Sequence, residues 1–400
     1  MSAQVRAGMN RTMLSKIQVV RRAPDRTVCA FVRFRADGED VHGLAFRLEG
    51  AVTRVNGVRL PPFDEIVVDC AEADADVVVE VKTRGWLYSG LRSVMGRFLS
   101  HAPGHLMPRA PIELPQQIFW PEAEPLQDRP FVSIVIPTRD QLDLLRTAIA
   151  TLFENASWSP IELIVVDNGS VEPATLDYLA QISQRPDVVV VRDDRPFNFA
   201  RLINLGAARA QGEVLAFLNN DVEAVDQDWL APLVALAMDS RVGAVGTRLL
   251  YGDGTVQHAG IALGVGGLAG HPGRGLSGQD PGPGGFLART RRTSAVTAAC
   301  MVVRRDRFEQ VGGFDEDYVV EFNDVDFCLR LEEAGFMTVC AACPTLVHRE
   351  GSTRNARLLR AQEIRDRSRF MRQWGTRLPS DPWYPAPLSP RDESLSTSIT

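Results

Sequence analysis

The strongest constraint on the fold is a regular alternation of apolar runs and helical patterns between Phe131 and Asp221. Four apolar runs predict buried strands, at Val132–Ile136, Ile161–Val166, Asp187–Val191 and Glu213–Leu218. Apolar residues at helical spacing predict helices between them, at Leu142–Phe153, Ala174–Gln184 and Phe199–Gln211. Strands that alternate with helices form right-handed βαβ units. The stretch therefore predicts an α/β fold, with a mostly parallel sheet and helices on both faces.

Polar residues follow three of these strands. Pro137-Thr138 ends the first, Asp167-Asn168-Gly169-Ser170 the second, and Asn219-Asn220-Asp221 the fourth. In open parallel sheets, ligands bind beyond the carboxyl ends of the strands. This edge is therefore the predicted active site.

Together with later segments, these motifs resemble the inverting family 2 glycosyltransferases, which have the GT-A fold. The resemblance covers about residues 131–350 and also rests on Asn198–Gly206, Thr297–Val303, Val311–Asp315, Asn323–Arg330 and Val347-His348. Each motif alone is weak, but their order and spacing are specific. The subgroup that the chain resembles is the rhamnosyltransferase-like one that builds bacterial surface polysaccharide.

The resemblance implies a metal-dependent enzyme that moves a sugar from a nucleotide-diphosphate-sugar to a saccharide acceptor. The expected donor is a UDP- or dTDP-sugar, and the expected acceptor is a lipid-linked polysaccharide. Negative charge develops on the departing diphosphate, and a divalent cation stabilises it. The expected cofactor is Mg²⁺ or Mn²⁺, which bind oxygen ligands from few protein groups.

The metal ligands implied by the resemblance are Asp221 and His348, and Asn220 is expected to contact substrate. Asn219 stands where the family has an acid, so we expect metal to bind weakly in the absence of nucleotide. Two other interpretations remain open. Asn-Asn-Asp after a strand is also an ordinary Asx turn, and a lone histidine is often structural.

The nucleotide is expected in a cleft lined by residues of the same edge. Asp167 would accept the N3–H of uracil or thymine, because a carboxylate is a directional acceptor. The other expected contacts are Pro137, Thr138, Asn198, Asn204 and Gly206. A turn with a helix cap also explains the Asp-Asn-Gly-Ser sequence, and it does not exclude nucleotide binding.

The general base implied by the resemblance is Asp324, and Asp326 beside it is an expected substrate contact. Asn323 replaces the family's usual preceding acid, although Glu321 is near. The two aspartates also fit the start of a helix, where the helix dipole stabilises negative charge. Both interpretations of this segment remain open.

The remainder of the chain predicts additional parts around residues 131–375, the catalytic domain. Residues 1–100 are expected to hold a basic N-terminal arm, a small antiparallel β domain and an amphipathic helix, Trp86–Leu99. Residues 101–130 are proline-rich and predict an extended linker. Residues 252–285 predict a functional loop, and residues 376–400 predict a disordered tail.

Composition excludes some classes of function. A net charge of −6 and a pI near 5.7 argue against nucleic-acid binding. The scattered cysteines, six in all, are expected to be reduced and buried. The chain shows no signal peptide and no apolar run of membrane-spanning length. It is expected to be cytoplasmic, with possible peripheral contact to the inner membrane face through Trp86–Leu99.

Two other functions are compatible with the sequence. A nucleotidyltransferase also combines a nucleotide pocket with acidic metal ligands, but it would be expected to show a glycine-rich, lysine-bearing loop after the first strand. Pro137-Thr138-Arg139-Asp140 is not such a loop. A non-catalytic carbohydrate- or nucleotide-binding subunit would explain why Asn219 and Asn323 replace acids.

Overall fold

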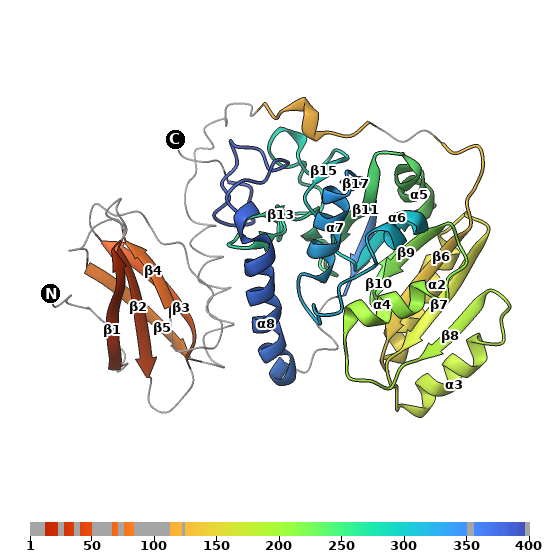
Figure 1. The fold of residues 1–400 in the computed structure, drawn as a ribbon, viewed down its shortest axis with the longest axis horizontal. Helices are drawn as coiled ribbons and strands as arrows, with labels where there is room; N and C mark the ends of the chain where they lie inside the picture. Colours follow the sequence, from red (N-terminus) through yellow and green to blue (C-terminus); the bar gives the residue numbers. More distant parts are fainter. Residues whose placement is uncertain are drawn as a thin grey trace. The chain divides into compact units, whose positions relative to one another are not determined.

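The structure, a computed structural model, describes residues 113–121, 125–349 and 356–396, together with the backbone of five strands between residues 13 and 83. The chain divides into two compact units, Met1–Arg109 and Ala110–Thr400 (Figure 1). Among the described residues, no helix combines the length and apolarity that crossing a membrane requires.

The N-terminal unit contains antiparallel strands. β1 (Met13–Arg22), β2 (Val28–Arg35) and β4 (Ile66–Cys70) form one sheet, and β3 (Val41–Glu49) pairs with β5 (Asp76–Thr83). β2 to β5 overlap predicted strands. β1 lies where the sequence predicted a loose arm. It is a strand that pairs antiparallel with β2. The predicted helix Trp86–Leu99 and the strands predicted within residues 52–60 lie outside the described residues.

The second unit is built on a ten-stranded sheet, and four of these strands are the predicted parallel part. The strands β6 (Val132–Thr138), β7 (Ile161–Asp167), β8 (Val188–Arg192) and β9 (Val214–Leu218) lie in the order β9-β6-β7-β8 with all three pairings parallel. The helices between them are α2 (Leu142–Glu154), α3 (Pro173–Ile182) and α4 (Phe199–Ala207). The predicted α/β architecture is therefore confirmed, although α4 ends before the predicted Gln211.

The other six strands of the sheet run in mixed directions. They include β10 (Val222–Ala224), β11 (Val242–Leu250), β16 (Cys300–Arg304) and β17 (Met337–His348). β16 is antiparallel to both β9 and β11, β17 is parallel to β11, and β10 is antiparallel to β17. Two short strands, β12 (Val256–His258) and β15 (Arg291–Thr293), pair with β11 and β17.

Alternate residues of the same strands supply two hydrophobic cores, one on each face of the sheet. Ile134 of β6 packs into the core that contains α2, α3 and α5 (Leu230–Met238). Its neighbour Val135 packs into the core that contains α4, α6 (Arg305–Gln310), α7 (Asn323–Glu333) and α8 (Ala356–Trp374). Such alternation is the side-chain period of a strand covered on both faces.

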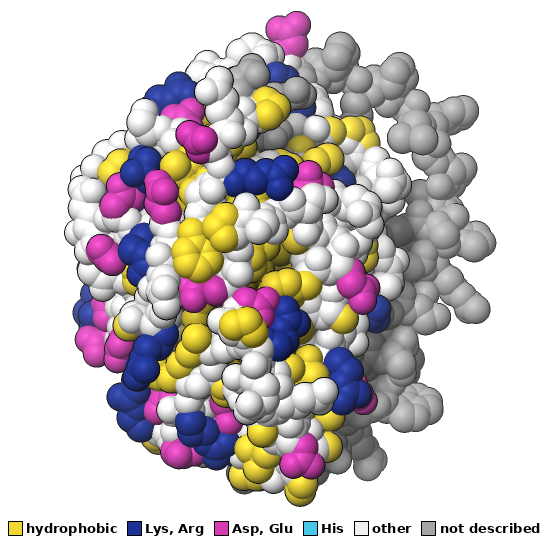
Figure 2. Space-filling model, turned by 90° about the vertical axis from the view of Figure 1, so that its right-hand side faces the viewer, with side chains coloured by type: hydrophobic (Ala, Val, Ile, Leu, Met, Phe, Trp, Pro, Cys, Tyr) yellow, Lys and Arg dark blue, Asp and Glu magenta, His cyan; other side chains and the backbone are white. Residues whose placement is uncertain are grey.

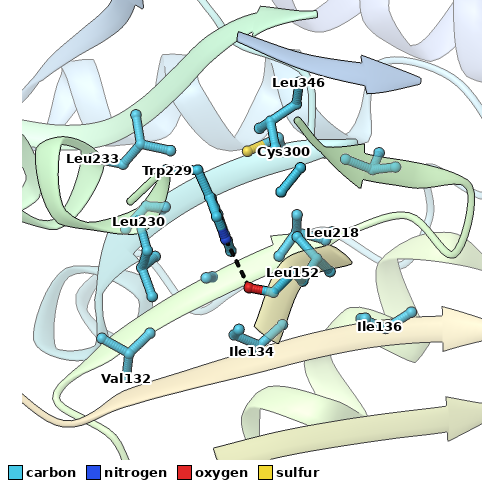
Figure 3. Packing of buried hydrophobic residues seen from close by; sticks show 14 of the residues in the cluster. Val132, Ile134, Ile136, Leu152, Leu218, Trp229, Leu230, Leu233, Cys300 and Leu346 are labelled. Carbon is cyan, nitrogen blue, oxygen red and sulfur yellow. Dashed lines mark hydrogen bonds between the residues drawn. The ribbon is translucent and has the colours of Figure 1, made fainter. Parts of the chain in front are cut away.

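Trp229 is the largest fully buried side chain of the first core. Its ring lies among Ile134, Leu230 and Leu233, and its indole Nε1 donates to the Leu152 carbonyl at 2.9 Å (Figure 3). The one polar atom of the ring is thereby satisfied, so the whole side chain can be buried without a desolvation penalty.

The segments predicted as linker and disordered tail are partly ordered, which corrects that prediction. The 3₁₀ turn η1 (Gln116–Ile118) and residues 376–396 lie against the loop at 252–285. Leu114, Ile118, Leu388 and Leu395 are buried in one cluster with Val256 of β12. The sequence around these residues is rich in Pro and Ser, which is why a linker and a disordered tail were predicted. A few apolar side chains suffice to pack such a segment when another segment presents an apolar surface.

Charge on the face shown in Figure 2 is mixed, with acidic and basic side chains interspersed and without a continuous basic area among the described residues there. Many of the described basic side chains form short-range ion pairs, such as Arg185–Asp187 and Arg192–Asp194, both at 2.7 Å.

Gly206 has a different role from the predicted one. A Cβ at this position would lie 2.3 Å from Cγ1 of Val135 and 3.0 Å from Cγ2 of Val166. The glycine therefore allows α4 to pack closely on β6 and β7, and its expected role at the nucleotide stays a prediction.

We expect Gly206→Ala to destabilise the second unit by about 1–3 kcal/mol, because overpacking a filled core costs that much. The measurement is chemical denaturation followed by tryptophan fluorescence. Gly252→Ala is the matched control, since a Cβ there would approach only the Arg349 guanidinium, at 3.4 Å. Equal stability of the two variants would show that α4 can shift without cost.

Candidate active site

Asp221 and His348, the predicted metal ligands, lie together. The chain leaves β9 at Leu218, turns through Asn219 to Asp221 and enters β10, whose first residue Val222 pairs with His348. Oδ1 of Asp221 lies 3.0 Å from Nε2 of His348, and both side chains are buried. Backbone pairing therefore brings together two residues that are far apart in the sequence.

The donor atoms of this pair fit a divalent cation. Nδ1 of His348 lies 2.8 Å from Oε1 of Gln257. In the tautomer that carries its hydrogen on Nδ1, this ring donates to the Gln257 oxygen and leaves Nε2 as an acceptor. Nε2 and the Asp221 carboxylate are then two converging acceptors, and Asn219 Nδ2 lies 3.3 Å from Nε2. Converging imidazole and carboxylate acceptors are a ligand set for divalent metals.

The protein contributes few ligands here. Within the described ranges, no group of three or more His, Cys, Asp and Glu residues could hold a metal. A cation bound by Asp221 and His348 would therefore complete its coordination with phosphate oxygens and water, as Mg²⁺ usually does. This agrees with the expectation that metal binds weakly without nucleotide.

Thr138 and Asn220 connect the metal pair to the adjacent strand end. Asn220 Nδ2 donates to Thr138 Oγ1 at 3.0 Å, and Thr138 and Pro137 are the last residues of β6. Both β6 residues are buried. The carboxyl ends of β6 and β9 are thereby held in a fixed relation at the predicted edge.

Asp167 is held by two protein donors. Its Oδ1 accepts the Ser170 N–H at 2.9 Å, and its Oδ2 lies 2.5 Å from Arg192 NH1. Each carboxylate oxygen can accept more than one hydrogen bond, so acceptor capacity remains while the orientation is fixed. Arg192, the last residue of β8, was missed by the sequence analysis. Its position at the carboxyl end of a strand was the available signal.

A second carboxylate at this edge, Asp193, has two arginine partners. Asp193 is buried and lies 2.7 Å from Arg195 Nε and 3.0 Å from Arg201 Nε. Burial alone would raise the pKa of this carboxyl, but the hydrogen bonds from Arg195 and Arg201 lower it to about 2. Asp193 is therefore ionised and fixes the turn that follows β8.

Asn198 and Asn204 have structural partners where substrate contacts were predicted. Asn198 caps α4 by accepting the Arg201 N–H at 2.9 Å, and its Nδ2 donates to the Glu316 carbonyl at 2.7 Å. Asn204 accepts the Phe314 N–H and donates to the Phe314 carbonyl, both at 2.9 Å. These amides hold the 314–316 segment onto α4, and their expected contact with the base stays a prediction.

Asp324, the predicted base, lies in the first turn of α7. Its Oδ2 accepts the Ala298 N–H at 3.2 Å and its Oδ1 accepts the Val325 N–H at 2.8 Å. Burial raises the pKa of this carboxyl above its ordinary value, against the lowering effect of these hydrogen bonds. A carboxylate with a raised pKa is a stronger base, which suits proton abstraction.

Asp326 does not reach the edge of the sheet, so the prediction that it contacts substrate is wrong. Its side chain has no exposed surface; it pairs with Arg330 at 2.8 Å and accepts from Trp374 Nε1 at 3.0 Å and Gln373 Nε2 at 2.9 Å. These partners belong to α7 and α8. Asp326 follows Asp324 by two residues in α7, and side chains at this spacing point to different sides of a helix. The two aspartates therefore have different surroundings.

α8 also fixes the segment that precedes Asp324. The buried Asp366 carboxylate accepts the N–H groups of Val320 and Glu321 at 2.8 and 3.0 Å. The rings of Phe322 and Phe370 stack at 4.5 Å, while Phe322 adopts a left-handed backbone conformation immediately before α7. A bulky residue in this region is strained and persists only when its surroundings hold it. Asp366 was not among the residues predicted from the sequence.

Four of the cysteines lie in the part of the structure with described side chains, and all four are free thiols. Cys300, Cys328 and Cys340 are buried, as expected, and burial raises the pKa of Cys300 and of Cys328 to about 12. Cys343 is exposed, because it lies in the part of β17 next to Pro344, where the strand's register shifts against β11.

Residues 133–312 match the family described as Glycosyl transferase family 2. The chain carries a glycosyl transferase family 2 domain. This match spans β6 to α6 and includes Asp221 and the turns at the carboxyl ends of β6 and β7.

Two curated relatives extend the likeness beyond this domain. The uncharacterized protein y4gI of Sinorhizobium fredii is 39% identical over 300 residues, which are 73% of this chain and 33% of that protein. The O-antigen biosynthesis protein RfbC of Myxococcus xanthus is 36% identical over 321 residues, 80% of this chain and 24% of that protein. The chain thus spans a third or less of the length of these relatives.

Among solved structures, GalNAc-T7 with UDP, GalNAc and Mn²⁺ has a TM-score of 0.50 and 18% identity. The alignment covers 63% of this chain and 50% of that one. At this identity the likeness concerns the fold alone, and it agrees with a GT-A-like arrangement of the family 2 domain.

We expect Asp326→Asn to lower the free energy of unfolding by about 3–5 kcal/mol, because it leaves the Arg330 guanidinium without its buried counter-charge. Asp306→Asn, which removes an exposed partner of Arg304, should cost at most about 1 kcal/mol. Denaturant titrations of both variants test this. A loss of activity by Asp326→Asn at unchanged stability would place Asp326 at the substrate instead.

Proposed function

We propose that the chain is a metal-dependent, inverting glycosyltransferase that transfers a sugar from a nucleotide-diphosphate-sugar to a saccharide acceptor. The observation that carries the proposal is the convergence of Asp221 and His348, 3.0 Å apart, at the edge of the sheet where β6, β7 and β9 end. The family 2 domain supplies the class of reaction, and the geometry supplies the residues.

The donor is a UDP- or dTDP-sugar. Its base would lie at the ends of β6 and β7, where Asp167 accepts the N3–H and Arg192 keeps the carboxylate oriented. Pro137, Thr138 and Asn220 form the adjoining wall between the base and the metal pair. A fixed acceptor of this kind favours a pyrimidine that presents an N–H over a cytosine, which does not.

The cofactor is Mg²⁺ or Mn²⁺, held by the Asp221 carboxylate and by Nε2 of His348. Bound there, the cation would stabilise the negative charge that develops on the leaving diphosphate. Asn219 contributes no charge at the position where the family has an acid, so the phosphates supply most of the negative charge around the cation.

Asp324 acts as the general base. Its carboxylate takes the proton of the acceptor hydroxyl while the hydroxyl oxygen forms a bond to the anomeric carbon. The bond between that carbon and the diphosphate oxygen breaks on the opposite side, so the configuration inverts. The diphosphate leaves with the bonding electrons, and Asp324 later releases the proton to solvent.

The acceptor and the location are part of the proposal. RfbC is named an O-antigen biosynthesis protein, which supports a lipid-linked polysaccharide as acceptor. Enzymes that extend such acceptors act at the membrane surface, so we place the chain in the cytoplasm with a peripheral contact to the inner membrane face. We further propose that residues 1–100 fold as a separate antiparallel β domain and that residues 131–375 carry catalysis.

The first test concerns the metal. Donor turnover should require Mn²⁺ or Mg²⁺ when a panel of UDP- and dTDP-sugars is assayed, and Asp221→Ala should abolish it. The fold should remain intact, because a carboxylate at a strand end contributes little packing. Thermal unfolding checks the fold. Unchanged turnover in Asp221→Ala would contradict the metal assignment.

The second test concerns the base. Asp324→Asn should lower kcat about 10²–10⁴-fold, the usual contribution of a positioned base, while donor Kd changes little. In the wild type, kcat should fall on the acid side with an apparent pKa above 3.8, the ordinary value for aspartate, because burial raises the pKa of Asp324 and protonation removes the base. Glu321→Gln is the control, since Glu321 pairs with Arg367 at 2.8 Å. Should Glu321→Gln abolish turnover while Asp324→Asn does not, the base is Glu321.

A further inference from the structure

We propose that Gln257 is a positioning residue for the metal pair. Its side-chain oxygen accepts the Nδ1–H of His348 and so keeps Nε2 of the same ring free to bind a cation beside Asp221. The inference rests on the proposed function, because it assigns a role to a residue that supports the proposed ligand His348. Gln257 would touch neither substrate nor cation.

The contact is built by the sheet. β12, which carries Gln257, and β17, which ends in His348, pair with opposite sides of β11, and Leu249 of β11 is in register with both His258 and Leu346. The glutamine side chain is buried, with 4% of its surface exposed. Its Oε1 lies 2.8 Å from Nδ1 of His348, which is a full hydrogen bond.

The hydrogen bond matters because His348 has two competing acceptors. Oε1 of Gln257 faces Nδ1, and Oδ1 of Asp221 faces Nε2 at 3.0 Å. A neutral imidazole carries one N–H and can satisfy only one of them. If the hydrogen is on Nε2, it bonds to Asp221 and the nitrogen cannot bind a metal. Gln257 favours the hydrogen on Nδ1, so it favours the metal-binding tautomer.

The adjoining histidine anchors β12. The Gly260 N–H lies 3.1 Å from Nε2 of His258, so Nε2 is an acceptor and the hydrogen is on Nδ1. That Nδ1 lies 3.0 Å from Nδ1 of His271, which accepts it. Burial lowers the pKa of both rings, that of His271 to about 3. Both histidines are therefore neutral. The hydrogen on Nδ1 of His258 is then donated to Nδ1 of His271.

Residues 252–285 include both β12 and His271, so this anchoring joins two parts of the same segment. The backbone N–H of His271 donates to the Glu393 carboxylate at 2.6 Å. The strand that carries Gln257 is thus held through His271 and, beyond it, by the C-terminal segment. Its side chain is consequently placed with little freedom, which is what positioning an imidazole requires.

The experiment measures Mn²⁺ affinity and not turnover. Mn²⁺ is titrated into the full chain alone, with saturating UDP and with saturating dTDP, and free Mn²⁺ is followed by electron paramagnetic resonance. Gln257→Leu keeps the approximate volume but removes the acceptor, and it should weaken nucleotide-dependent Mn²⁺ binding about 10–100-fold. Gln257→Glu keeps an acceptor at the same position and should retain affinity within a few fold.

The two variants separate positioning from packing. If Gln257 only filled space, the leucine would be tolerated, and the glutamate would be the harmful change because it buries a charge. Gln373→Leu is a matched control, since its amide donates to Asp326 and not to the metal pair; its Mn²⁺ affinity should equal that of the wild type. Thermal unfolding confirms that each variant is folded before affinities are compared.

The outcomes also separate this inference from the proposed function. His348→Ala should abolish nucleotide-dependent Mn²⁺ binding. If it does while Gln257→Leu binds like the wild type, or if glutamate and leucine are equally harmful in folded protein, the inference is overturned and the metal site stands. If His348→Ala binds Mn²⁺ like the wild type, both the ligand assignment and the role of Gln257 are wrong.

Discussion

The pairing of β10 with β17 is the interaction on which the candidate site depends. It places Val222 opposite His348 and so brings Asp221 to 3.0 Å from the imidazole. β10 is only three residues long, yet the register is fixed, because a shift by one residue would turn the side chains to the opposite face. The candidate metal ligands therefore depend on backbone hydrogen bonds between segments that are distant in sequence.

Helix α8 has a comparable role for the candidate base. Asp366 accepts backbone N–H groups of the segment before α7, and Phe370 stacks on Phe322. Trp374 donates to the buried Asp326, which follows Asp324 by two residues in α7. The beginning of α7 is thus held by a helix that follows it by many residues. Such rigid support is what a proton-abstracting carboxylate needs, since small displacements cost rate.

Most polar groups at this edge are committed to the protein itself. Asn198 and Asn204 hold the 314–316 segment, Asp193 holds the turn after β8, and Arg192 orients Asp167. Asp221 and His348 lie together at this edge, 3.0 Å apart, and Asp167 keeps acceptor capacity. An edge in which the surrounding groups are already satisfied presents a preorganised site, because few side chains must rearrange when a ligand binds.

The sequence by itself determined the α/β architecture, the strands and helices from β6 to α4, and the edge where the site lies. These follow from local periodicity and from turn residues at strand ends, which need no distant partner. The motifs also named Asp221, His348 and Asp324 as candidates, and their roles stay predictions. Only the tertiary structure decided that Asn198, Asn204, Gly206 and Asp326 hold the fold together, and that Asp366, Arg192 and Gln257 support the candidate site. The same type of side chain can cap a helix, pack in a core or bind a ligand. Which of these it does depends on the distant segment that lies against it.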